Sequence, residues 1–556
     1  MYQSAHSGKQ VQFNSTPCTN TRYRAATMIA LAAPLVMAAG IVGATVSANT
    51  SRCSAAFFTP LAPKNVTIKS ADIVAATAAA PQYCRVLASV AVPGNTDDFL
   101  AGFPTTWNEH FVWASQGGFA GQTMTLSNGF LQAGYATGIT DTGHQGSATA
   151  TGGAGRDITW ALNNPQKLTD YGHRANHVTA DAAKSLIASY YQSAITRSIF
   201  NGCSNGGRSV MINAQRYPGQ FDGYVVGAPF ISPTQSSLDY LLHSGRGFFA
   251  KTTSFPTAAK LSLVGNAVLA ACDVEDGVKD GVVGNPLACR FDPRTLQCPG
   301  GGDTAGCLSK DQVDAFVVWN TDVRNVSGEL VSRRWLFTGV EGEPTGTTLY
   351  QVGPNPAPVD AKGVPIISSA QNLGFSLLNG AIGGFVFQDP SYDVRKFDIE
   401  TDLGYLAEVD GQIAANDTNL SGVLKNGAKF LFYHGWADPT LNPLNTVDYY
   451  NDVVARYGKA KTDSLMRVFM VPGMTHCSGG TATTDTFDTN AAMERWLDTK
   501  IAPDVIDASK VVGGVVTRTR PLCAYPTYAR YRPPAAAAST FGIEDAFYFS
   551  CVAPAQ

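Results

Sequence analysis

The stretch that decides the fold is Ser198-Ile-Phe-Asn-Gly-Cys-Ser-Asn-Gly-Gly-Arg208, an apolar strand that runs into a turn and then a helix. Its centre, Gly202 to Gly206, fits the pattern G-x-S-x-G. In this pattern the serine sits on a sharp strand-to-helix turn that requires small neighbours and exposes the hydroxyl group. We therefore expect Ser204 to be a catalytic nucleophile; a purely structural Gly-Ser turn is the alternative.

Strands alternate with helices on both sides of this turn, which predicts a mostly parallel sheet and an α/β protein. We expect an α/β-hydrolase fold built from residues 49–230 and 426–556. The alternation is lost between residues 231 and 425, where Gly-rich and Pro-rich pieces and four cysteines occur, so we interpret this stretch as a large insertion over the sheet. The expected elements include strands at 111–114, 198–201, 222–229, 428–434 and 465–471 and a helix at 179–191.

Residues 1–48 have the pattern of an export signal peptide. Basic residues precede an uncharged apolar run from 25 to about 46, and Val46-Ser47-Ala48 supplies the small residues of a cleavage site. The run is long enough to span a bilayer, so a membrane anchor is the alternative. We predict cleavage near Ala48, a secreted or periplasmic mature chain, and no stable membrane insertion after cleavage.

A serine nucleophile needs a base, and the base needs a carboxylate that orients it. In the α/β-hydrolase order, an acid and then a histidine follow the serine, each at a strand end. Asp438 follows the strand expected at 428–434, and His476 follows the strand expected at 465–471. We assign Asp438 as the orienting acid and His476 as the base. His434 is the rival base, but its position on the strand favours a packed structural histidine.

Ten of the eleven cysteines follow the expected signal peptide, and an even number in an exported chain indicates disulfides. Pairing close neighbours leaves Cys203 and Cys477, which adjoin Ser204 and His476. A bridge between them would bring serine and histidine within hydrogen-bonding reach, because bridged Cα atoms lie about 4.4–6.8 Å apart. Two buried free thiols are the alternative. The expected local bridges are Cys53–Cys84, Cys272–Cys289, Cys298–Cys307 and Cys523–Cys551.

These positions resemble the tannase and feruloyl esterase family. That family is marked by Cys-Ser, then Asp, then His-Cys, with a disulfide that joins the catalytic serine and histidine; here the positions read Cys203-Ser204, Asp438 and His476-Cys477. The likeness runs from about residue 53 to 551. It implies that residues 231–425 form the family's lid domain, which covers the active site and shapes substrate choice. Further matches are Gly117-Gly118-Phe-Ala-Gly, Arg174-Ala-Asn-His-Val-Thr, Ala214-Gln-Arg-Tyr-Pro, Phe221-Asp-Gly-Tyr-Val-Val-Gly-Ala-Pro and His434-Gly-Trp-Ala-Asp-Pro.

The oxyanion hole needs two backbone donors. The amide that follows the nucleophile, the N–H of Asn205, is the first. The glycine-rich loop at 117–118 should supply the second, and we choose Gly118. A donor of this kind contributes about 3 kcal/mol of transition-state stabilisation.

An acidic, glycine-punctuated loop runs from Asp273 to Val283, between Cys272 and Cys289. It is similar to an EF-hand loop, but Gly284 stands where a bidentate Glu would bind Ca²⁺. A solvated acidic turn is the alternative. The family resemblance implies a structural Ca²⁺ site that stabilises the lid far from catalysis, with Glu275 pointing outward. The implied ligands are the side chains of Asp273, Asp276 and Asp280 and the carbonyls of Val278 and Val282.

We expect a secreted serine carboxylesterase that hydrolyses small esters of aromatic acids through an acyl-enzyme. The resemblance leaves the acyl group open among feruloyl, galloyl and terephthaloyl monoester types. A short-chain aliphatic esterase on the same scaffold and a non-catalytic, calcium-dependent binding protein are the alternatives. The 556-residue chain carries a formal net charge of −3, so it has no basic field that would hold nucleic acid. The oligomeric state stays open.

Overall fold

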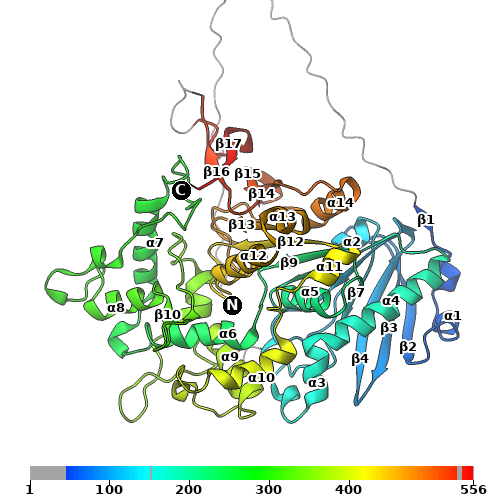
Figure 1. Cartoon of the computed structure of the whole chain (residues 1–556), viewed down its shortest axis with the longest axis horizontal. Helices are drawn as coiled ribbons and strands as arrows, with labels where there is room; N and C mark the ends of the chain where they lie inside the picture. Colours follow the sequence, from blue (N-terminus) through cyan, green and yellow to red (C-terminus); the bar gives the residue numbers. More distant parts are fainter. Residues whose placement is uncertain (1–44, 151–152, 535–540, 555–556) are drawn as a thin grey trace, which may run out of the picture. The chain divides into compact units, whose positions relative to one another are not determined.

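A nine-stranded sheet forms the centre of the computed structural model, which describes residues 45–150, 153–534 and 541–554 (Figure 1). Neighbouring strands are parallel from β13 through β7 and antiparallel from β7 through β2. In spatial order the strands are β13 (Met466–Val471), β12 (Lys429–Gly435), β9 (Gly223–Gly227), β8 (Arg197–Cys203), β6 (His110–Ala114), β7 (Ala136–Thr140), β4 (Asn95–Pro104), β3 (Tyr83–Val92) and β2 (Val66–Val74).

Most neighbouring pairs are parallel, as the sequence pattern predicts, but the sheet is mixed and not parallel throughout. The difference lies at its N-terminal edge. There β3 ends at Val92 and β4 begins at Asn95, and so short a connection joins antiparallel strands only. From β6 onward, longer connections through helices return the chain to the same edge and keep the strands parallel.

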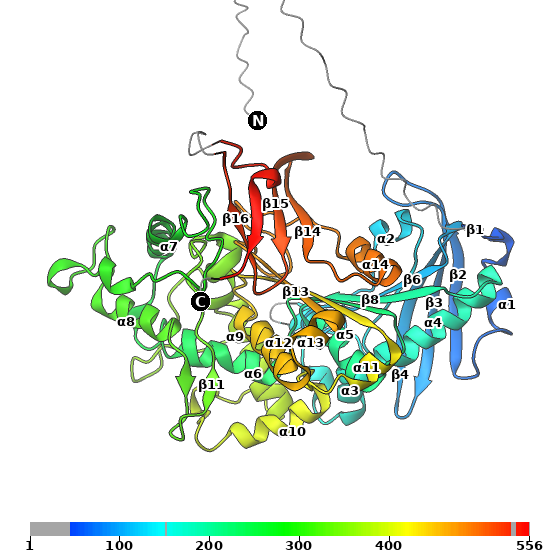
Figure 2. The same ribbon diagram turned by 45° about the horizontal axis from the view of Figure 1, so that its top comes forward.

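Alternate residues of the central strands pack on opposite faces of the sheet, as the period of two requires. Phe430 and Phe432 of β12 face one core, which helices α4, α5 and α12 cover, and Leu431 faces another, which α14 and the β14–β15 hairpin cover. Figure 2 shows the hairpin and α14 on one side of the sheet and α4, α5 and α12 on the other. The covering elements are α4 (Ala175–Tyr191), α5 (Asn205–Arg216), α12 (Pro443–Tyr457), α14 (Thr489–Thr499), β14 (Val505–Val512) and β15 (Val515–Cys523).

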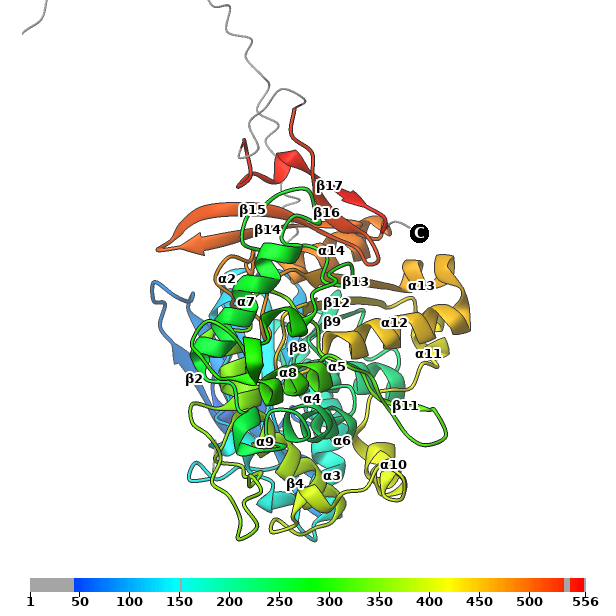
Figure 3. The same cartoon turned by 90° about the vertical axis from the view of Figure 1, so that its left-hand side faces the viewer.

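Residues 231–425 contribute no described strand to the nine-stranded sheet and pack around an apolar core of their own. Figure 3 looks onto this segment. Phe119, Trp160 and Tyr171, which precede it in the chain, belong to the same core. The limits of hydrolase and lid domains therefore stay predictions. The elements of the segment are α6 (Pro233–Asp239), α7 (Ala258–Cys272), α8 (Lys310–Trp319), β10 (Val323–Arg324), β11 (Leu330–Ser332), α9 (Leu373–Leu378) and α10 (Leu403–Ile413).

The expected signal peptide lies almost wholly outside the described residues, which begin at 45. Its last residues are described: β1 (Val46–Ser47) pairs with β5 (Thr106–Trp107). Cleavage near Ala48 and export stay predictions. Among the described residues, no helix combines the length and the apolar character needed to cross a bilayer.

All five expected disulfides are present in the structure. They tie the first residues after β1 to β3, the serine turn to the loop after β13, and the acidic loop to the end of α7. The last bridge joins β15 to β17 (Phe549–Val552), which pairs with β16 (Tyr528–Tyr531). The Cα–Cα distances are 5.6 Å for Cys53–Cys84, 6.0 Å for Cys203–Cys477, 5.3 Å for Cys272–Cys289, 5.0 Å for Cys298–Cys307 and 5.6 Å for Cys523–Cys551.

Candidate active site

Ser204 lies on the sharp turn between β8 and α5. Its backbone has φ +63° and ψ −126°, a conformation that L-residues rarely adopt and that costs about 1–3 kcal/mol. Only glycine fits at the two glycine positions of the G-x-S-x-G pattern, because other backbone atoms approach closely there. A Cβ at Gly202 would lie 2.5 Å from the backbone of Gly206, and a Cβ at Gly206 would lie 2.7 Å from the carbonyl oxygen of Ser115. The turn is held because the N–H of Ser204 donates to the carbonyl of Gly227, at 3.0 Å.

Asp438 is buried at the end of β12 and accepts hydrogen bonds on both carboxylate oxygens. His476 Nδ1 lies 2.8 Å from Asp438 Oδ2, and His434 Nε2 lies 3.0 Å from the same oxygen. Oδ1 accepts from the backbone N–H groups of Thr440, at 2.8 Å, and Leu441, at 3.1 Å. The carboxylate is therefore fixed in position and oriented toward the ring of His476.

The electrostatic balance keeps Asp438 ionised. Burial alone would raise the pKa of this carboxyl group. The charge of His476 and the hydrogen bonds from His434 and His476 outweigh burial, so the pKa of Asp438 lies well below its ordinary value. An ionised carboxylate at this position can stabilise a protonated imidazole at His476.

The Cys203–Cys477 bridge joins the end of β8 to the loop after β13, although β9 and β12 lie between these strands. Ser204 and His476, next to the two cysteines, line one cavity of about 370 Å³. No hydrogen bond between Ser204 Oγ and His476 is present in the described part of the chain. Catalytic hydrogen bonds often tighten only when substrate binds.

The two expected oxyanion donors, Gly118 and Asn205, adjoin the same cavity. Gly117 and Gly118 line the cavity. Gly118 has φ +58°, and a Cβ there would lie 2.3 Å from the carbonyl oxygen of Gly155, so only glycine fits. The Asn205 side chain donates to the carbonyl of Gln116, at 3.1 Å, and thereby ties the start of α5 to the glycine loop.

Sequence reasoning missed a buried arginine behind the oxyanion donors. Arg208 has no exposed surface, and its Nε donates to the Asn205 side chain at 2.7 Å. Its other nitrogens donate to the carbonyls of Tyr171, Gly172 and Ile413, each at 2.8 Å. Burial lowers the pKa of Arg208. The residue connects the serine turn to the end of α10, and no spacing in the sequence indicates this contact.

Sequence reasoning also missed a cation in the catalytic cavity. Arg156 lines this cavity, and its Nε is buried without a hydrogen-bond partner among the described residues. No aspartate or glutamate is among the described lining residues. Two side chains from the inserted segment, Tyr350 and Leu377, complete one wall, and the Tyr350 ring lies 6.0 Å from the ring of His476. The cavity is positively charged and partly apolar.

Hydrogen bonds from its own backbone N–H groups to an aspartate stabilise the acidic loop between Cys272 and Cys289. The carboxylate of Asp273 accepts from the N–H groups of Asp280, Gly281 and Val282 at 3.0–3.2 Å. Asp280 pairs with Arg520 and lies 3.6 Å from Arg518. Among the described residues, no group of three or more acidic, histidine or cysteine side chains is arranged to hold a metal ion.

The chemistry of this loop nevertheless suits a hard cation. Asp273 and Asp276 are buried, and burial, followed by the charges of Asp280 and Asp273, raises the pKa of Asp276 to about 7. A small cavity of about 30 Å³ is bordered by Asp276, Asp280 and Val282. Glu275 is exposed, as expected from the sequence. The carboxylates repel one another, and the arginines supply the counter-charge.

Comparison with known proteins decides the family. The family model described as "Tannase and feruloyl esterase" matches residues 84–543. The chain belongs to the tannase and feruloyl esterase family. This membership makes it a carboxylic ester hydrolase with the α/β-hydrolase fold, as the sequence motifs predict.

Two relatives show how far this family likeness extends. An uncharacterized esterase of Xanthomonas campestris pv. campestris is 32% identical over 92% of this chain and 93% of its own. A mono(2-hydroxyethyl) terephthalate hydrolase of Piscinibacter sakaiensis is 31% identical over 87% of each chain.

Two solved structures of fungal proteins share the fold. The crystal structure of an esterase from Aspergillus oryzae has a TM-score of 0.77 at 23% identity and covers 90% of this chain and 100% of that one. A tannin acyl hydrolase from Aspergillus niger has a TM-score of 0.68 at 19% identity and covers 92% of this chain and 97% of that one. At these identities the likeness concerns the fold alone.

Removal of the Cys203–Cys477 bridge should lower turnover more than stability. We expect the C203S/C477S variant to lose about 100-fold in kcat with little change in KM, because a displacement of about 1 Å at the serine is enough for such a loss. Steady-state kinetics on an ester, with thermal unfolding in parallel, measures both effects. The C298S/C307S variant is the matched control, and an unchanged kcat in C203S/C477S would contradict the positioning role.

Proposed function

We propose that this chain is a secreted serine carboxylesterase that hydrolyses esters of aromatic acids through an acyl-enzyme on Ser204. The observation that carries the proposal is the 2.8 Å hydrogen bond between Asp438 and His476, which lines one cavity together with Ser204. The disulfide between the residues next to Ser204 and His476 supports the same pairing. His434, the rival base, is buried and is not among the described residues that line this cavity.

The reaction proceeds in two steps of acyl transfer. Ser204 Oγ attacks the ester carbonyl while His476 accepts its proton, and Asp438 stabilises the resulting imidazolium. The N–H groups of Asn205 and Gly118 stabilise the oxyanion. His476 returns the proton to the departing alcohol, and a water molecule, activated by His476, then releases the acid and regenerates the serine.

The shape and charge of the cavity favour one kind of substrate. Phe230, Tyr350 and Leu377 supply apolar surface for a ring. Arg156 supplies a positive charge that no described carboxylate neutralises. Among feruloyl, galloyl and terephthaloyl monoester substrates, we favour those with an anionic group on the ring, because a guanidinium binds a carboxylate in two parallel hydrogen bonds. A short-chain aliphatic ester would leave Arg156 unused.

We also propose that the acidic loop binds a structural Ca²⁺ ion through Asp273, Asp276 and Asp280 and the carbonyls of Val278 and Val282. The small cavity and the mutual repulsion of the buried carboxylates support this assignment. Binding requires Asp280 to exchange part of its contact with Arg520 for the cation. The ion would stabilise the loop that Cys272 and Cys289 close and would take no part in the ester chemistry.

Substitutions in the triad and at His434 should show which of the two histidines, His476 or His434, is the base. We expect Ser204→Ala and His476→Ala each to lower kcat by at least about 10⁴-fold. His434→Gln should cost only about 10- to 100-fold, since it removes one hydrogen bond to a charged group. Hydrolysis rates of an aryl-acid ester and of a plain butyrate ester, measured side by side, give these values. Equal losses in the two histidine variants would contradict the assignment of the base.

Removal of calcium should lower stability without removing activity. We expect chelation to reduce Tm by about 5 °C, because an ion bound only to the folded state stabilises that state. Asp276→Asn should abolish the response, whereas Glu275→Gln, in the same loop, should retain it. Thermal unfolding and elemental analysis measure these outcomes, and a protein without stoichiometric calcium would contradict the site.

Arg156 should select charged substrates. For a terephthalate monoester we expect Arg156→Gln to lower kcat/KM by about 10- to 100-fold, since a charge-assisted hydrogen-bond pair is lost. For the matched neutral diester the change should stay below about threefold, because no such pair forms. Arg156→Lys should restore part of the monoester rate. A loss of the same size for both esters would show that Arg156 supports the fold of the glycine loop instead.

A further inference from the structure

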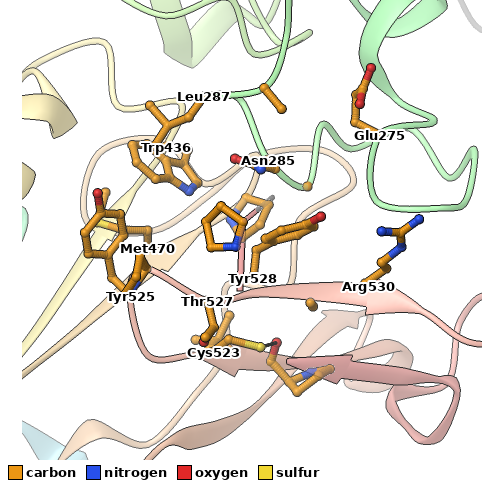
Figure 4. A pocket seen from close by; sticks show the side chains of 18 of the residues that line it. Glu275, Asn285, Leu287, Trp436, Met470, Cys523, Tyr525, Thr527, Tyr528 and Arg530 are labelled. Carbon is orange, nitrogen blue, oxygen red and sulfur yellow. Dashed lines mark hydrogen bonds between the residues drawn. The ribbon is translucent and has the colours of Figure 1, made fainter. Parts of the chain in front are cut away.

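A second cavity, of about 400 Å³, lies among three segments of the chain (Figure 4). The acidic loop and its continuation to Arg290 form one side, the ends of β12 and β13 form another, and the chain between β15 and β16 forms the third. The two cavities share no described lining residue. Trp436, which lines this second cavity, lies two positions before Asp438 in the chain.

Aromatic side chains form part of the wall of this cavity. Trp436 is 5% exposed, and Tyr525 and Tyr528 border the same space, together with Met470 and Leu287. In Figure 4 the indole nitrogen of Trp436 is turned toward the cavity, and its N–H has no acceptor among the described residues. Flat rings of this kind stack on a planar ligand, and the free N–H can meet a polar substituent.

The rim of the cavity carries an excess of positive charge. Arg290 and Arg530 are exposed side chains that line it. Arg290 donates to the carbonyl of Leu287, at 2.9 Å, and neither arginine pairs with a carboxylate among the described residues. Glu275 is the one acidic side chain among the described lining residues. Two guanidinium groups beside aromatic walls complement a ligand that combines a ring with an anionic group.

We propose that this cavity binds a small planar aromatic carboxylate, with its ring against Trp436 and Tyr528 and its carboxylate at the rim arginines Arg290 and Arg530. The volume lies within the usual range for sites of small ligands, about 300–1,000 Å³. An acid of this class is also what the proposed ester hydrolysis releases. The site can therefore hold product away from Ser204, although binding itself does not depend on the reaction.

Calorimetry on a protein whose catalytic cavity is closed tests this site. Ser204 is blocked with a bulky aryl phosphonate, and mass spectrometry verifies the block. 4-Hydroxybenzoate and its neutral amide are then titrated into the blocked protein in separate experiments. We expect one acid molecule to bind per chain and the amide to bind at least about 10-fold more weakly. The R290Q/R530Q variant should also bind the acid about 10-fold more weakly. The R294Q/R495Q variant, which removes two exposed arginines outside this cavity, should bind as the parent does.

The proposal would be overturned by no binding to the blocked protein, by equal affinity for acid and amide, or by unchanged affinity in R290Q/R530Q. Equal binding of a neutral sugar such as xylose would also contradict a carboxylate site. A chain that does not take up the phosphonate counts against the proposed function and not against this cavity. In that case the unblocked protein is titrated, and the difference between the two arginine double variants decides.

Discussion

The disulfide between Cys203 and Cys477 is the constraint on which the arrangement of the active site depends. It joins the end of β8 to the loop after β13, across two intervening strands of the sheet. The bridge adds a covalent link to the hydrogen bonds that hold Ser204 to Gly227 and His476 to Asp438. Because the bridge lies one residue from both groups, it fixes their separation directly. Tyr350 and Leu377 of the inserted segment and the glycine loop line the same cavity as this pair.

The backbone conformation of the serine turn costs free energy, and contacts from several parts of the chain stabilise it. Its left-handed backbone at Ser204 requires Gly202 and Gly206 to approach other backbone atoms closely. Arg208 helps to hold the residue after Ser204, because it connects Asn205 to the carbonyls of Gly172 and Ile413 in a fully buried network. The same network joins the oxyanion side of the site to the end of the inserted segment. The serine turn and the inserted segment are therefore physically linked through one buried guanidinium.

The residues that act locally could be predicted from the sequence, and those that act through distant contacts could not. Ser204, Asp438 and His476 each follow a strand, and the cysteines beside Ser204 and His476 remain unpaired once close neighbours are joined. Arg156 lies in a glycine-rich stretch without any pattern, and its role follows only from its place in the cavity beside Gly118. The antiparallel edge from β2 to β4 was also missed, because the strand pattern does not reveal the short connection that decides direction.

Peptide mapping of the unreduced protein after reaction with an aryl fluorophosphonate tests the central claim most directly. The account predicts a single labelled peptide that contains Ser204 and is still disulfide-linked to the peptide with His476 and Cys477. Free thiols at Cys203 and Cys477, or a label on any other residue, would contradict it.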